Sequence, residues 1–62
     1  MDYELPKDPI ILLGTINMKL RDFYPSMDAL CDDLNLSLEE IDARLTGAGF
    51  FYDAHTNQYH PK

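Results

Sequence analysis

The sequence predicts a small, mainly α protein in the α+β class, with three helices in a helix-turn-helix-like arrangement and then a C-terminal β-hairpin. Three observations predict it. Apolar residues recur at helical spacing, polar capping residues stand where helices would begin, and an aromatic segment with turn residues follows the last glycine. The alternative fold is a plain three-helix bundle with an irregular tail.

The length sets the domain organisation. A chain of 62 residues is one domain, and a domain of this size buries only about 60% of the surface that its unfolded chain exposes. We therefore expect a single small domain over 1–62, beginning with an extended leader at 1–7. The core of such a domain leaves only a thin margin of stability, and self-association would increase the buried surface.

The first helix is expected at 8–24. Asp8 is a suitable N-cap, Pro9 fits the first helical position, and Pro25 ends the helix by Tyr24. The apolar face is expected to consist of Leu13, Ile16, Leu20 and Phe23, widened by Ile10 and Leu12. The residues expected to stay mostly outside are Asn17, Lys19, Arg21 and Asp22.

The second helix is expected at 26–34, where Ser26 is the N-cap and Asn35 tolerates the left-handed conformation that often ends a helix. Its apolar residues are Met27, Leu30, Cys31 and Leu34.

The third helix is expected at 37–47. Ser37 and Glu40 have the spacing of a capping box, and Gly47 or Gly49 supplies the stop. Leu36 can staple onto Ile41 at its start. The apolar face is expected to consist of Leu38, Ile41 and Leu45.

The segment 50–60 is expected to form the hairpin. Strand alternation places Phe50 and Tyr52 on one face and Phe51 with Asp53 on the other. Asp53 can start the turn, and Asn57 suits a positive φ. The return strand is expected to be Gln58, Tyr59 and His60, with Pro61 blocking further pairing.

The charge distribution argues against DNA binding through the third helix. Eleven acidic and five basic residues give a net charge of −6, which repels polyanions. Between Asp28 and Asp42 there are six acids and no base. The residues that would face DNA in a helix-turn-helix are Glu39, Glu40 and Asp42.

No catalytic, cofactor-binding or metal-ligating set is expected, so the chain is predicted not to be an enzyme. Cys31 lies on an apolar stripe and is expected to be a core residue. His55 and His60 do not have a recognised zinc-ligand spacing. The acids of the second helix are expected to form a solvated face; these are Asp28, Asp32 and Asp33.

Membrane insertion and secretion are not expected. The longest apolar run, Ile10 to Leu13, is far shorter than the ~20 residues of a membrane span. No secretory signal is recognised at the N-terminus, and a single cysteine excludes an internal disulfide framework. We therefore expect a cytoplasmic protein.

Two functions from different classes are compatible with these observations. The first is a non-catalytic protein-interaction module that binds an unknown protein or forms a homodimer through the aromatic hairpin, where Phe51 and Tyr59 are candidates. The alternative is a winged helix-turn-helix-like regulator that binds nucleic acid. It would use the basic residues Lys7, Lys19 and Arg21. A structural interpretation is also open, in which Lys19 and Arg21 are only part of a solvated face.

Several blocks resemble a known family. They are LPKDP at 5–9, LL at 12–13, N-x-KLRD-x-Y at 17–24, S-x-D-x-LC at 26–31 and the closing G-x-x-YD-x-x-x-NQY. In this order they resemble the short bacterial proteins named domain of unknown function 4250. Met27 and Gly14 stand where a leucine and a small polar residue would be expected. The resemblance implies a stand-alone bacterial protein and assigns no activity or site residue.

Two of these blocks contain charges that the helix pattern does not require. They are Lys7, Asp8, Arg21 and Asp22. One interpretation is a structural network that ties the leader to the first helix. The other is a surface patch that a partner reads. The sequence leaves both open.

Overall fold

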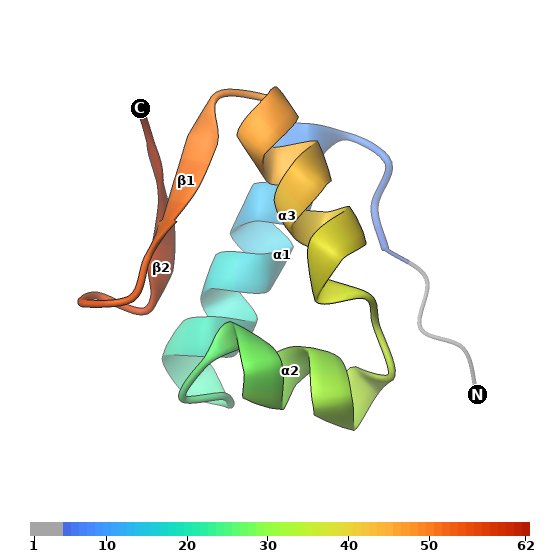
Figure 1. Cartoon of the computed structure of the whole chain (residues 1–62), viewed down its shortest axis with the longest axis vertical. Helices are drawn as coiled ribbons and strands as arrows, with labels where there is room; N and C mark the ends of the chain where they lie inside the picture. The colour runs from blue at the N-terminus through green and yellow to red at the C-terminus, as the bar shows by residue number, and fades with distance from the viewer. Residues whose placement is uncertain (1–4) are drawn as a thin grey trace.

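A computed structural model describes residues 5–62, so positions 1–4 of the expected leader lie outside the described residues. Three helices, α1 (Pro9–Asp22), α2 (Met27–Leu34) and α3 (Leu38–Gly47), precede an antiparallel hairpin of β1 (Phe50–Asp53) and β2 (Gln58–Pro61). In Figure 1, α2 runs across the lower ends of α1 and α3, and the hairpin lies along their flank. This confirms the predicted helix-turn-helix-like class with a hairpin.

The helices begin at the predicted caps. Asp8, Ser26 and Ser37 have extended backbones, and their side chains accept N–H groups of the first turn. The donors are the backbone nitrogens of Ile10, Ala29 and Glu40, at 2.8, 3.1 and 3.2 Å. Each helix therefore starts one residue after its cap. The first helix also ends earlier than expected, at Asp22.

Left-handed backbone occurs at the predicted asparagines and at one glycine. Asn35 ends α2 with φ 56° and ψ 48°, and Asn57 has φ 56° in the hairpin loop. Gly49 has φ 98°, a value that strains side-chain-bearing residues, and it turns the chain from α3 into β1. Local turn chemistry thus places the ends of three elements.

The core is formed by α1, α2, α3 and β2. Its buried residues are Leu12, Ile16, Leu20, Met27, Leu30, Cys31, Ile41, Leu45 and Tyr59. Phe50 and Tyr52 pack against it from β1, as strand alternation predicted.

The predicted apolar face of α1 is partly wrong. The buried stripe is Leu12, Ile16 and Leu20, while Leu13 is half-buried. Phe23 is 68% exposed, because α1 ends at Asp22 and Phe23 leaves the helix with φ −127°. Ile10 is exposed as well. The inner face is thus rotated relative to the one expected from spacing.

The prediction that Pro61 blocks pairing is wrong. Pro61 lies opposite Phe50 within the ladder, and the next residue, Lys62, donates its N–H to the Gly49 carbonyl at 3.0 Å. Hydrogen-bonded pairs alternate with non-hydrogen-bonded pairs in an antiparallel ladder. The Lys62–Gly49 bond therefore puts Pro61 in a non-hydrogen-bonded pair, where the ladder needs no N–H from it.

The outer edge of β2 is closed by a side chain of α1. Tyr59, opposite Tyr52, directs its N–H and carbonyl away from β1. The Asn17 side chain accepts this N–H at 2.8 Å and donates to this carbonyl at 3.0 Å. Asn17 was expected outside. It is half-buried and takes the place of a neighbouring strand.

A second amide joins the hairpin loop to the end of α1. Asn57 donates to the carbonyls of Leu20 and Tyr24, at 3.2 and 3.0 Å. Its side-chain oxygen accepts from the Tyr52 hydroxyl at 2.6 Å. The left-handed backbone of Asn57 therefore serves both the turn and the attachment of the hairpin to the helix.

Replacement of the Asn17 amide tests this edge. We expect Asn17→Ala to lower the free energy of unfolding by about 1–3 kcal/mol, because two hydrogen bonds to a strand edge are lost together. Urea unfolding measures the change. The matched control is Asp32→Ala, at an exposed position of α2, which should change stability by less than about 0.5 kcal/mol. Equal effects of both variants would contradict this role of Asn17.

Candidate functional site

The four residues proposed from the sequence as interaction candidates lie in different environments. Tyr59 is 2% exposed and belongs to the core. Its hydroxyl donates to the Asp42 carboxylate at 2.7 Å, and its ring centroid lies 5.3 Å from that of Tyr52. Burial, together with the Asp42 carboxylate, raises the pKa of Tyr59. Its side chain is thus an interior group rather than part of a binding surface.

Phe51 does lie on the outer side of the hairpin, as alternation predicted, and is 42% exposed. Its ring is 6.2 Å from the ring of His60, centroid to centroid. The Nε2 atom of His60 is also 2.8 Å from the Thr56 hydroxyl. Across residues 5–62, no three histidine, cysteine or acidic side chains gather where they could hold a metal ion.

The basic candidates do not form one patch. Arg21 forms an exposed ion pair with Asp22, Nε to Oδ1 at 2.9 Å. Hydrogen bonding between them raises the pKa of Arg21 and lowers that of Asp22. Lys19 lies near this end of α1, whereas Lys7 precedes the helix. The helix between Pro9 and Lys19 alone rises by about 15 Å.

The charged blocks are accordingly not a single network between leader and helix. Asp8 caps α1, and Arg21 pairs with its neighbour Asp22. The leader is held instead by Arg44 of α3. One Arg44 nitrogen, Nη2, donates to the carbonyls of Pro6 and Lys7 at 2.6 and 3.1 Å.

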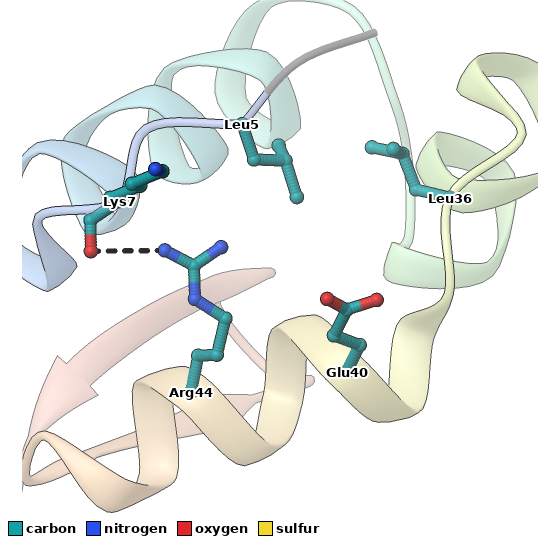
Figure 2. Close-up of a pocket in the computed structure, with 5 residues that line it drawn as sticks. All are labelled: Leu5, Lys7, Leu36, Glu40 and Arg44. Atoms are coloured by element: carbon teal, nitrogen blue, oxygen red, sulfur yellow. Dashed lines mark hydrogen bonds between the residues drawn. The ribbon is translucent and has the colours of Figure 1, made fainter. Parts of the chain in front are cut away.

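Sequence reasoning missed Arg44, although it is the one base between Asp28 and Gly47. It lines a shallow hollow of about 400 Å³ between the leader and α3. In Figure 2, the Arg44 and Glu40 side chains rise from α3 toward the leader, while Leu5 and Leu36 form the apolar part. The hollow combines opposite charges with two leucines, and the Arg44 hydrogen bonds give it a structural role.

The acidic residues of α3 have different surroundings. Glu39 and Glu40 are exposed at its first turn, where their charge suits the helix dipole. Asp42 was expected to face DNA. It is half-buried and accepts the Tyr59 hydroxyl, because the hairpin covers that side of α3.

The largest collection of exposed apolar groups lies on α1. Of five such large side chains in residues 5–62, Ile10, Ile11 and Met18 belong to α1, and Phe23 caps its end. Ile11 and Met18 are 59% and 39% exposed. They are seven residues apart and share a helical face with Gly14. We call Ile11, Gly14 and Met18 the α1 outer face.

Sequence reasoning also missed this surface. The spacing of Ile11, Gly14 and Met18, three and then four residues, is that of a helix-packing seam. Gly14 is exposed, and a Cβ added to it would meet nothing within 4 Å. Neither the φ of Gly14 nor an internal contact requires a glycine here.

Because Gly14 lies inside a helix, its replacement should stabilise the isolated domain. We expect Gly14→Ala to raise the free energy of unfolding by about 0.5–1 kcal/mol, since alanine has the higher helix propensity. Urea unfolding of dilute protein measures this change. The matched control, Gly49→Ala, should destabilise the domain because φ there is 98°. A loss of stability in Gly14→Ala would reveal an internal need for glycine.

The Tyr59 environment predicts sensitivity to alkali. A phenol whose pKa is raised in the folded state stabilises the fold below its unfolded pKa, about 10. That contribution is lost as pH rises through the higher folded pKa. We expect the unfolding free energy to fall above about pH 10 and this fall to be smaller in Tyr59→Phe. Urea unfolding across pH checks it, and an identical decline in both proteins would contradict the assignment.

No curated protein and no solved structure matches the chain. Among residues 5–62, none of the helices has the length and apolar content that a membrane span requires. The family described as Domain of unknown function (DUF4250) matches residues 6–59. This match covers most of the chain, and it includes the blocks that carry the resemblance apart from Leu5. The protein therefore belongs to the DUF4250 family of unknown function.

Proposed function

We propose that this chain is a non-catalytic protein-interaction module that binds a partner protein through the α1 outer face. The observation that carries the proposal is the exposure of Ile11 and Met18 on either side of Gly14. Isolated exposed apolar residues are common, but aligned ones on a small domain mark interaction surfaces. Exposed Ile10 lies at the margin of this face and enlarges it.

The state of the reactive groups supports a non-catalytic role. Cys31 is buried, and burial, with the nearby charge of Asp28, raises the pKa of its thiol. A catalytic cysteine needs the opposite, a lowered pKa and access to substrate. The Asp42 carboxylate accepts the Tyr59 hydroxyl, and Asp33 accepts that of Tyr24 at 2.5 Å. These groups are engaged in holding the fold.

The hairpin, where strand alternation predicts an interaction through Phe51, is the smaller surface. Tyr59 is interior, and Phe51 is the one large apolar side chain exposed on the described hairpin. Phe51 also lies beside the ring of His60. The α1 outer face is therefore the better candidate for the interaction surface, and a cross-linking experiment compares it with the hairpin.

The charges favour a protein partner over nucleic acid. Arg21 is paired with Asp22, and Lys7 lies at the far end of α1 from Lys19. Glu39 and Glu40 occupy the start of α3, where a helix-turn-helix would meet phosphates. A net charge of −6 adds a repulsive field.

Site-specific photo-cross-linking in cells tests the proposal. A photoreactive amino acid replaces Met18 in one variant, Phe51 in a second, and Asp32 as the control in a third. We expect a discrete cross-linked product from position 18, to a protein of either the same or another kind, and little from Asp32. Since position 18 is exposed, the replacement should not disturb the core.

The cross-linked products distinguish the α1 outer face from the hairpin as the interaction surface. A product from position 51 and none from position 18 would move the interaction to the hairpin. Products from neither position would contradict an interaction module. Circular dichroism of each purified variant checks that its fold is retained.

A further inference from the structure

We infer that the outer edge of β1 binds an extended, basic segment of another protein, which adds to the hairpin as an antiparallel third strand. The outer edge is the side of β1 that faces away from β2. It is a different surface from the α1 outer face, so the inference goes beyond the proposed function. Three features support it: unpaired backbone groups, the width of the helix layer beneath the hairpin, and the acids beside the edge.

The first feature is the set of backbone groups at this edge. Tyr52 lies opposite Tyr59, and Phe50 lies opposite Pro61. Both are non-hydrogen-bonded pairs of the ladder, so Tyr52 and Phe50 direct their N–H and carbonyl groups away from β2. Within residues 5–62, none of these backbone groups forms a hydrogen bond.

The two edges of the hairpin differ in this respect. On β2, the Asn17 side chain pairs with the N–H and the carbonyl of Tyr59. On β1, no side chain of the described residues does the same for Tyr52. The strand also contains neither the lysine nor the proline that commonly protects an open edge. Such an edge is a template for a further extended strand, so its hydrogen-bonding pattern specifies the backbone of the partner.

The second feature is the width of the helix layer. The strand β1 packs against α3, and β2 packs against α1. Neighbouring strands are about 4.8 Å apart, whereas packed helices are about 8–10 Å apart. Two strands are thus narrower than the two helices that they cover. A single further strand beside β1 lies over α3 and needs no helices of its own.

The same spacing argues against a second copy of this chain as the partner. Antiparallel pairing of two β1 strands would bring both α3 helices to the same side of the joined sheet. The strands would be about 4.8 Å apart, but the two helices beneath them need about 8–10 Å. An extended segment without a helix layer avoids this overlap, so the partner is a segment of another protein.

The third feature is charge. Asp42 lies on the side of α3 that the hairpin covers, since it accepts the Tyr59 hydroxyl. Glu39 and Thr46, three residues before Asp42 and four after it, share this helical face. Asp53 ends β1 itself. These carboxylates favour a segment that contains lysine or arginine, and the net charge of −6 acts in the same direction.

NMR of the isotope-labelled full chain tests the inference. The probe is the peptide acetyl-Lys-Val-Lys-Val-Lys-Val-Lys-amide, whose alternation directs lysines toward α3 and valines toward the side of Phe51. We expect saturable shifts of the Phe50 and Tyr52 amides at peptide concentrations up to about 1 mM. Hydrogen exchange of both amides should slow by about threefold or more. Without peptide, the Tyr52 amide should exchange faster than that of Tyr59, which is bonded to Asn17.

Methylation of the peptide backbone separates strand addition from attraction by charge alone. Residues of the added strand opposite Phe50 and Tyr52 share their face of the sheet and direct their N–H groups to β1. In the probe these residues are the lysines. Methylation of the lysine amides should therefore weaken binding about tenfold or more, and methylation of the valine amides should leave it unchanged. Equal binding of the two methylated peptides would overturn the inference.

A matched pair of variants tests the position of the added strand. Glu39→Gln removes the carboxylate on the hairpin side of α3, and Glu40→Gln removes its neighbour, which lines the hollow near Arg44. Both residues belong to the first turn of α3, so each variant loses a similar interaction with the helix dipole. We expect Glu39→Gln to weaken peptide binding about two- to fivefold at low salt and Glu40→Gln to have a smaller effect. An equal loss in both variants would overturn the placement of the strand over α3.

The shifted amides also separate this inference from the proposed function. Shifts at Ile11 and Met18 with none at Tyr52 would place the peptide on the α1 outer face and overturn the inference while supporting the proposed function. Shifts of Phe50 and Tyr52 that grow with protein concentration alone, together with a dimer, would assign the edge to a second copy and overturn the inference. The absence of any shift would overturn it too, and cross-links from position 18 would still support the interaction module.

Discussion

The fold depends on the attachment of a two-stranded hairpin to α1 through side-chain amides. A hairpin of this size is marginal alone, and β2 would expose an unpaired edge. Asn17 satisfies the edge groups of Tyr59, and Asn57 reaches the carbonyls at the end of α1. These bonds place the Tyr59 ring in the core, where its hydroxyl reaches Asp42 of α3. One hairpin thereby joins the first and third helices.

This attachment leaves one side of α1 buried and the other side exposed. The side with Leu12, Ile16 and Leu20 faces the core, and Asn17 beside it meets the hairpin. The remaining side exposes Ile11 and Met18 to solvent. In a larger domain another layer would cover these groups. Here no further element among the described residues covers them.

The helix-turn-helix-like outline is combined here with acidic residues at the helix that contacts DNA in other proteins of this outline. Its third helix starts with Glu39 and Glu40, and Asp42 turns inward to Tyr59. Three packed helices with a hairpin are an economical way to enclose a small core. Contacts to phosphate backbones need basic side chains, and the start of α3 presents acidic ones instead.

Local chemistry was sufficient to predict where the helices begin, where α2 ends and where the hairpin turns. The caps at Asp8, Ser26 and Ser37 and the left-handed residues Asn35 and Asn57 act within a few positions of themselves, so a single sequence contains the information. The wrong or missed features are Phe23, Asn17, Pro61, Arg44 and the α1 outer face. Phe23 is exposed because α1 ends at Asp22, and each of the others depends on contacts between segments distant in sequence or on a strand register. Spacing shows that a helix has an apolar face but not which neighbours will cover it. Only the packing of the hairpin and α3 decided which side of α1 was buried and which was left exposed.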